Sequence, residues 1–133
     1  MASVNNPIVP GFYPDPSVCR VGNKYYMVHS TFAYFPGIPV FESEDLANWK
    51  QIGNVLDRDS QIPLANSAHS EGIFAPTIRY HDGTFYVITT NIPVPGNFIV
   101  TAKNPAGPWA CTPPATERIP AATPTSPCLP TGR

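Results

Sequence analysis

The chain has 133 residues, of which 42% are hydrophobic and 11% aromatic, so one small domain with a core is expected rather than a disordered chain. Charged residues make up only 13% and the net charge is −1, which excludes the clustered basic surface of a nucleic-acid-binding protein. There is neither an apolar run long enough for a membrane span nor a readable secretory signal, so we expect a cytoplasmic protein that does not enter membranes.

Short segments rich in β-branched and aromatic residues predict an all-β fold. They are Lys24–Thr31, Ile38–Glu42, Thr84–Thr90 and Asn97–Ala102. Glycine, proline, asparagine and aspartate bound these segments, and the 18 prolines of the chain disfavour long helices. Gly22-Asn23 and Asp82-Gly83 each lie between two such segments, which is the sequence chemistry of a hairpin turn.

A shift of 60 residues places the first half of the chain on the second. Pro16 falls on Pro76, Tyr26 on Tyr86, Val40 on Val100 and Trp49 on Trp109. The agreement extends over about thirty positions without a gap, and such a period, with four short strands in each unit, is typical of a β-propeller blade. Two blades are visible, whereas a propeller typically has about four to eight. We therefore expect only part of a propeller here.

One repeat unit has a carboxylate at a position where the other has none. Asp15 stands where the second unit has Ala75, although the neighbouring prolines match. The inner strands of a propeller converge on its axis, so a polar residue at the start of such a strand can point into the axial cavity. From the residues alone two interpretations stay open: Asp15 belongs to a site, or it caps a turn between Pro14 and Pro16.

Four motifs follow one another in the first eighty residues. They are NPIVPGFYPDPS from Asn6, STFAYFPGIP from Ser30, SEDLANW from Ser43 and GIFAPTIRY from Gly72. In this order they resemble glycoside hydrolase family 43, in its β-xylosidase and α-L-arabinofuranosidase branch. The likeness covers about residues 5–109 and implies the family fold, a five-bladed β-propeller. About the first two blades would lie in this chain.

The resemblance implies an inverting glycosidase that removes terminal β-1,4-xylosyl or α-L-arabinofuranosyl residues from xylan oligosaccharides. Such an enzyme holds two carboxyl groups about 6.5–9.5 Å apart, one to deprotonate a water and one to protonate the leaving oxygen. Asp15 matches the general base of the family. Phe32 and Phe74 match aromatic positions that help to wall the sugar pocket, although both residues also suit a core. Trp49 is expected to pack within its blade, because its repeat partner is also tryptophan.

The general acid and the aspartate that tunes its pKa lie further along the family's sequence than this chain extends. We therefore expect a truncated chain that is inactive alone, or alternatively a non-catalytic fragment with weak carbohydrate binding. Glu71 stands just before the fourth motif and is the remaining carboxylate to consider as an acid, without support from the family pattern. His29, His69 and His81 lack metal-ligand spacing, so no metal or cofactor is expected. His29 and His69 could line the cavity or pack in a loop.

We place a boundary near Trp109, between propeller blades over residues 1–109 and a proline-rich tail over residues 110–133. The tail shows no apolar period, which predicts neither strand nor helix. Read from the third base of each codon, Ala121–Ser126 can encode Gly-x-Asp-x-Asp-Leu, which resembles the family's third-blade motif. This gives the hypothesis of an out-of-frame tail, and a genuine proline-rich tail is the alternative.

Two expectations concern the assembly and the compartment. A two-blade chain exposes a strand edge and an apolar face, so we expect self-association or poor solubility. The cysteines, Cys19, Cys111 and Cys128, lack metal spacing and favour a reducing compartment, with Cys19 as a small buried hydrophobe. A Cys111–Cys128 disulfide is the alternative in an oxidising compartment.

Overall fold

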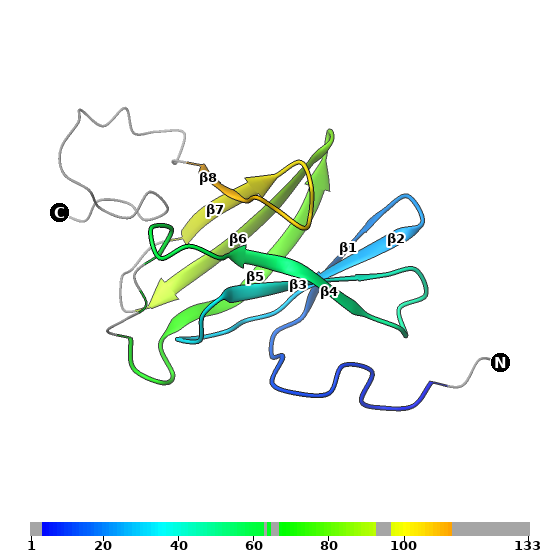
Figure 1. Cartoon of the computed structure of the whole chain (residues 1–133), viewed down its shortest axis with the longest axis horizontal. Helices are drawn as coiled ribbons and strands as arrows, with labels where there is room; N and C mark the ends of the chain where they lie inside the picture. Colours follow the sequence, from blue (N-terminus) through cyan, green and yellow to red (C-terminus); the bar gives the residue numbers. More distant parts are fainter. Residues whose placement is uncertain (1–3, 63, 65–66, 93–96, 113–133) are drawn as a thin grey trace.

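The computed structural model describes residues 4–62, 64, 67–92 and 97–112. Its regular elements in these residues are eight strands in two antiparallel four-stranded sheets (Figure 1). The first sheet holds β1 (Ser17–Val21), β2 (Lys24–Val28), β3 (Gly37–Ser43) and β4 (Lys50–Leu56), and the second holds β5 (Gly72–His81), β6 (Thr84–Ile92), β7 (Asn97–Ala102) and β8 (Ala110–Thr112). The all-β prediction is confirmed. The described residues contain no helix that could span a membrane.

Each sheet is a meander in which every strand pairs with the next one along the chain, as in a propeller blade. The turns Gly22-Asn23 and Asp82-Gly83 connect β1 to β2 and β5 to β6, so both predicted hairpins are confirmed. The first strands of the two sheets, β1 and β5, lie next to each other. The two units of the repeat are therefore two neighbouring blades.

The proposed tail begins with a strand that sequence reasoning did not predict. Ala110–Thr112 form β8 and pair with β7, so the expectation that no strand follows Trp109 is wrong for these three residues. Three residues are too short to show a period, and the strand exists because β7 offers a free edge. Residues 113–133 lie outside the described residues, together with the out-of-frame hypothesis and the Cys111–Cys128 alternative.

The 60-residue shift does not hold in the third strand of each blade. Val28 pairs with Val40 in the first sheet, whereas Ile88 pairs with Ile99 in the second, one residue earlier than the shift predicts. Directly paired residues share a face of the sheet, so the structural partner of Val40 is Ile99 and not Val100. Counted between paired residues, the stretch from Ile88 to Ile99 is one residue shorter than that from Val28 to Val40. The stretch from Val100 to Cys111 is one residue longer than that from Phe41 to Gln51.

The core lies between the two sheets. Val28 and Val40 of the first sheet and Val87 and Val100 of the second are fully buried within it. Side chains alternate between the faces of a strand, so each buried residue of β6 is followed by an outward one. The outward face of the second sheet carries Tyr86, Ile88, Ile92 and Ile99, which are 38–41% exposed. We call these four residues the outer face.

The outer face has a buried counterpart in the first blade. Tyr86, Ile88 and Ile99 occupy the repeat positions of Tyr26, Val28 and Val40, which are at most 8% exposed because the second sheet covers them. The ring of Tyr26, for example, lies 5.0 Å from that of Phe85 across the blade interface. The outer face thus has the chemistry of a blade interface without a blade on it in the described residues.

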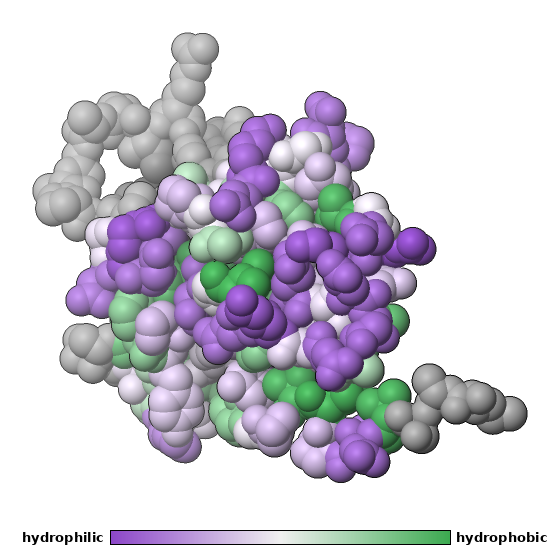
Figure 2. All heavy atoms as spheres, turned by 45° about the vertical axis from the view of Figure 1, so that its right-hand side comes forward, coloured by the Kyte–Doolittle hydropathy of each residue, from purple (hydrophilic) through white to green (hydrophobic). Residues whose placement is uncertain are grey.

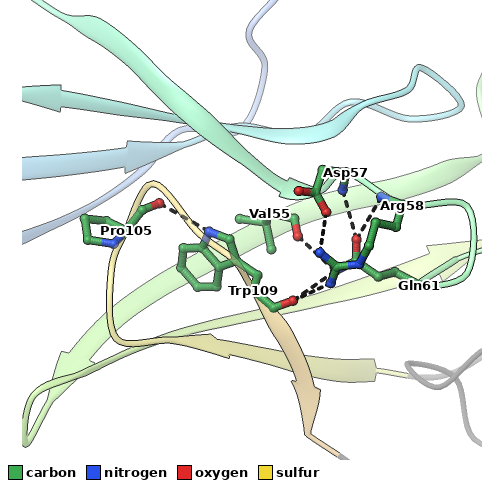
Figure 3. A network of polar contacts seen from close by, with 6 residues as sticks. All are labelled: Val55, Asp57, Arg58, Gln61, Pro105 and Trp109. Atoms are coloured by element: carbon green, nitrogen blue, oxygen red, sulfur yellow. Dashed lines mark hydrogen bonds and ion pairs between the residues drawn. The ribbon is translucent and has the colours of Figure 1, made fainter.

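A polar network joins the end of the first blade to the last strand of the second (Figure 3). The Gln61 side-chain oxygen accepts hydrogen bonds from the backbone N–H groups of Asp57 and Arg58 at 2.9 and 3.0 Å, and its nitrogen donates to the Val55 carbonyl at 3.2 Å. The Arg58 guanidinium donates to the carbonyl of Trp109 at 2.7 Å. We call this network the latch, because it connects Arg58 and Trp109, which are 51 positions apart in the sequence.

The two repeat tryptophans make equivalent contacts. The indole N–H of Trp49 donates to the carbonyl of Leu46 at 3.0 Å, and that of Trp109 donates to the carbonyl of Pro105 at 3.2 Å. Trp109 is 1% exposed, and Trp49 is half-buried. The contact fixes the turn before the last strand of each blade, which agrees with the expected packing role of Trp49.

The N-terminal segment runs along the free face of the first sheet. Together with that sheet it encloses a hollow of about 470 Å³, lined among others by Ile8, Val18, Met27 and Trp49. Figure 2 shows hydrophobic atoms in this region, next to the start of the described chain. The chain continues from the N-terminal segment through Tyr13 to Asp15. The path of this segment therefore determines the position of Asp15.

Candidate active site

The candidate site is built at a seam where the two sheets meet. Phe32 and Ile73 exchange backbone hydrogen bonds, N–H to carbonyl, of 2.9 Å in each direction. Gly72 precedes Ile73 with a φ of +96°, and a Cβ on it would lie 2.3 Å from the carbonyl oxygen of Phe32. Only glycine permits this approach, so the second motif and the fourth come together at one place.

Asp15 lies on a loop that is fixed to the same seam. The N–H of Ser30 donates to the carbonyl of Pro14 at 3.0 Å, and the Ser30 hydroxyl donates to the carbonyl of Ile73 at 2.6 Å. Ser30 is fully buried, so it joins the Asp15 loop to the second blade. Asp15 itself has a φ of +55°, is exposed, and makes no hydrogen bond or ion pair with any other described residue.

Phe32 and Phe74 form an aromatic wall at the seam. Their ring centroids are 5.1 Å apart in an edge-to-face arrangement, and both side chains are half-buried. Phe12 extends the wall on the other side of Phe32, with its ring centroid 5.9 Å away. A partly exposed aromatic face can pack against the apolar face of a sugar ring. The structure thus brings two of the predicted site residues into contact and fixes the loop of the third beside them.

His29 is a packing residue within the described part of the chain. Its side chain is 3% exposed, and its ring lies 5.3 Å from that of Tyr13 and 5.7 Å from that of Phe41. Burial lowers the pKa of His29, and the backbone carbonyls of Tyr13 and Pro14 partly oppose this shift. The lowered pKa keeps the imidazole neutral near pH 7. The ring packs against Tyr13 and so supports the segment that leads into Asp15.

The other two histidines are exposed. His69 lies near the wall, with its Nδ1 3.3 Å from the hydroxyl of Tyr34. His81 ends β5 at the second hairpin, as expected. No group of three or more histidine, cysteine or acidic residues could hold a metal ion in the part of the chain that the structure describes.

Several of the remaining carboxylates are occupied by structural roles. The Glu71 carboxylate accepts a hydrogen bond from the backbone N–H of Ala68 at 2.8 Å and so caps its own loop. The Asp45 carboxylate accepts hydrogen bonds from the N–H groups of Asn48 and Ala47, and these bonds hold its pKa well below the usual range. The third motif is therefore a turn, whereas nothing in the described residues places Glu71 as an acid beside Asp15.

Sequence reasoning missed a hollow beside the wall. It has a volume of about 590 Å³ and is lined by Phe12, Tyr13, Thr31, Tyr34 and His69. Phe12 and Tyr34 stand in the first two motifs, and aromatic residues in loops rich in glycine and proline were a signal that could have identified them. Their proximity depends on the Phe32–Ile73 seam, which no sequence pattern predicts.

The model of glycosyl hydrolases family 43 matches residues 4–119. The chain belongs to this family. The resemblance of the four motifs is thereby confirmed, and the two sheets are two blades of the five-bladed β-propeller that its members share.

Two curated relatives of the family 43 chain are similar to it over most of its length. It is 62% identical over 110 residues to a xylosidase/arabinosidase of Butyrivibrio fibrisolvens. This match covers 83% of this chain and 21% of the relative. It is 58% identical over 109 residues to a non-reducing end α-L-arabinofuranosidase of Bacteroides ovatus. This match covers 79% of this chain and 21% of the relative. The chain thus spans about a fifth of the length of these relatives.

Solved structures agree with the fold. The Bacteroides ovatus xyloglucan GH43B structure matches with a TM-score of 0.77 and 56% identity, over 81% of this chain and 22% of that one. A xylan β-1,4-xylosidase from Bacillus halodurans matches with a TM-score of 0.76 and 44% identity, over 82% of this chain and 22% of that one. At such identities the backbone course of the two blades is shared.

Proposed function

We propose that this chain carries the general base of an inverting glycoside hydrolase that removes terminal β-1,4-xylosyl or α-L-arabinofuranosyl residues from xylan oligosaccharides. The observation that carries the proposal is the attachment of the Asp15 loop, through Ser30 and Ile73, to the seam that holds Phe32 and Phe74. A carboxylate beside an aromatic wall combines proton acceptance with sugar binding. The names of the related xylosidases and arabinofuranosidases support the substrate class.

In this mechanism Asp15 accepts a proton from a water while the water oxygen attacks the anomeric carbon. The glycosidic bond breaks on the opposite side of the sugar, and a second carboxyl group gives its proton to the departing oxygen. Asp15 suits the first role because it is exposed and has no hydrogen-bonding partner among the described residues. Phe32 and Phe74 would hold the sugar ring against the wall and exclude water from its apolar face.

The second carboxyl group would come from outside these two blades. In the described residues Glu42 is paired with Lys24 at 2.8 Å, Asp57 with Arg58 at 2.9 Å, and Glu71 caps its loop. Loss of acid catalysis typically costs about 10²–10⁴-fold in rate. We therefore propose that these 133 residues, taken alone, bind sugar weakly and do not hydrolyse it.

The test begins with the nucleotide sequence after the Trp109 codon, read in all three frames. If a frame continues with an aspartate-bearing third blade, the protein encoded in that frame should hydrolyse an aryl β-xyloside or an aryl α-arabinofuranoside with inversion at the anomeric carbon. If no frame continues the family pattern, the proposed catalytic role is wrong for this gene product, and the binding fragment remains.

In the active protein, Asp15→Asn should lower kcat by about 10²–10⁴-fold, because the amide cannot accept the proton of the water. Asp82→Asn is the matched control: Asp82 is also exposed and also has a positive φ, of +45°, but lies in the second hairpin turn. It should leave kcat unchanged. Equal activity of the two variants would refute the role of Asp15.

We also propose that a second copy of this chain covers the outer face when these 133 residues are expressed alone. The outer face repeats the residues with which the first blade receives the second, so it is suited to receive another blade of the same kind. Such contacts join unlike surfaces of the two copies and need not stop at a dimer.

A further inference from the structure

The first sheet carries a further apolar face, on the side away from the second sheet. Val18 of β1 pairs with Met27 of β2, which pairs with Phe41 of β3, so the three side chains form a row on one face of the sheet. The neighbouring row, with Val28 and Val40, points the other way, into the core between the sheets. We call the row of Val18, Met27 and Phe41, together with the hollow of about 470 Å³ that the N-terminal segment encloses, the free face.

The free face repeats the surface with which the second blade packs on the first. In the second sheet Ile78 pairs with Val87, and Val87 pairs with Val100, which gives the same row over β5, β6 and β7. All three side chains are fully buried in the core between the sheets. The row of the free face therefore has apolar side chains at the positions that fill a blade interface, whereas neither sheet of the described residues covers it.

The outer face repeats the opposite half of that interface. Its residues Ile88 and Ile99 occupy the repeat positions of Val28 and Val40, which pack on the second sheet. Within the chain, the surface with Val28 and Val40 meets a row of the other kind and not a copy of itself. The outer face and the free face of one chain are thus the two unlike halves of a single kind of interface, one half on each sheet.

Part of the free face is open, and part is covered by the N-terminal segment. Val18 is 42% exposed, and Leu46, which lines the hollow, is 45% exposed. Phe41 lies against Tyr13, with the two ring centroids 5.2 Å apart in an edge-to-face arrangement. Among the described residues no lysine, arginine or carboxylate lines the hollow, so an apolar partner fits it. The Val18 end of the row and the hollow are therefore where aliphatic side chains of a partner can enter.

We propose that the free face of one copy receives the outer face of a second copy, so that the two chains join head to tail. The inference rests on the proposed coverage of the outer face by a second copy, and it adds which surface of that copy makes the contact. Ile88 and Ile99 of one copy would lie against Val18 and the hollow of the other. Contact between two outer faces is the alternative, and it would join two surfaces of the same kind, which do not meet in the chain's own blade interface.

The experiment compares lysine variants of the two faces by sedimentation velocity, over concentrations at which the wild-type chain associates. Val18→Lys should raise the dissociation constant at least about a hundredfold, because the contact would bury an unpaired charge. The double variant with Ile88→Lys and Ile99→Lys should do the same. Phe35→Lys is the matched control, since Phe35 is 43% exposed and belongs to neither face, and it should associate as the wild type does.

An equal mixture of the two lysine variants separates the proposal from its alternative. Val18→Lys keeps its outer face and the double variant keeps its free face, so the mixture should form a dimer with one copy of each and grow no further. Trp49 lines the hollow, so its fluorescence emission should shift to shorter wavelengths in this dimer, whereas the buried Trp109 should contribute no shift. Leu46→Lys takes the place of Val18→Lys if that variant fails to fold.

Three results would overturn the inference. The first is that Val18→Lys and Leu46→Lys associate as the wild type does while the double variant does not; the second is that the mixture stays monomeric; the third is that the mixture forms dimers without a change in Trp49 emission. In the first case a second copy still covers the outer face, so that proposal stands and only its contact surface is wrong. A wild-type chain that stays monomeric would overturn both proposals together.

Discussion

At the scale of single residues, Gly72 sets the distance between the two blades. We predict that Gly72→Ala lowers the free energy of unfolding by about 2–4 kcal/mol, because the new Cβ would meet the backbone of Phe32 at 2.3 Å and the φ of +96° suits glycine alone. Gly22→Ala is the control: its φ is +62°, yet nothing lies within 4 Å, so it should cost only about 1–2 kcal/mol. Urea unfolding midpoints measure both, and equal losses would contradict the prediction.

His29 should make stability depend on pH. The unfolded chain takes up a proton at His29 below about pH 6.5, whereas burial lowers the pKa of the folded imidazole. The unfolded state therefore binds more protons, and stability falls as the pH drops from 6.5, by at most about 1.4 kcal/mol per pH unit. His29→Phe should flatten this slope above about pH 5.5, where carboxyl groups with ordinary pKa values near 4 are almost fully ionised, and the exposed His81→Gln should not. An unchanged slope in His29→Phe would show that the histidine is not responsible.

The sequence made some of the site residues predictable and hid others. Asp15 could be found because the repeat has alanine at the matching position, and Phe32 and Phe74 because they stand in family motifs. The function of Ser30 could not be found, since its two hydrogen bonds join a loop and a strand that are distant in sequence. The catalytic role of Asp15 and the sugar contacts of the two phenylalanines stay predictions.

At the scale of elements, the latch is the polar connection to test. Gln61 is 2% exposed, and Gln61→Ala would leave the N–H groups of Asp57 and Arg58 and the Val55 carbonyl without their side-chain partner. We predict a loss of about 2–4 kcal/mol in the free energy of unfolding. The exposed Gln51→Ala should cost less than about 0.5 kcal/mol. A small loss in both variants would mean that water replaces the latch.

Strand prediction succeeded where β-branched and aromatic residues follow one another closely in the sequence. The expected segments correspond to β2, β3, β6 and β7, whose side chains fill the core. The first five residues of β4 are exposed or half-exposed, and β5 contains Ala75 and Pro76, so neither shows a clear pattern of β-branched residues. Both were predictable only through the repeat, which supplied four strands for each unit.

At the scale of the whole molecule, the outer face should control solubility. We predict that the 133-residue chain associates with increasing concentration in sedimentation velocity, and that Ile88→Lys combined with Ile99→Lys makes it monomeric. These two residues pair across β6 and β7, so two charges would stand at the centre of the outer face. Phe35→Lys places a charge on another exposed apolar residue and should leave association unchanged. A monomeric wild type with one cooperative melting transition would refute the proposal.

The architecture was visible in the sequence because a propeller is periodic, and the period survives in turns and tryptophans. The direction in which each residue of the third strand points was not visible. This direction depends on the lengths of the loops before and after the strand. The ungapped 60-residue match therefore aligns Val40 with Val100, although the two residues lie on opposite faces of their sheets.

The two loop-length differences around β7 cancel, and this has a consequence for anyone who exchanges parts between blades. A chimaera that copies β7 into the place of β3 by counting 60 residues would present Val100 to the wrong side and turn the strand inside out. The interchangeable module is the strand together with both flanking connections. The two copies thus keep the spacing of the tryptophans, while the third strand between them is displaced by one position.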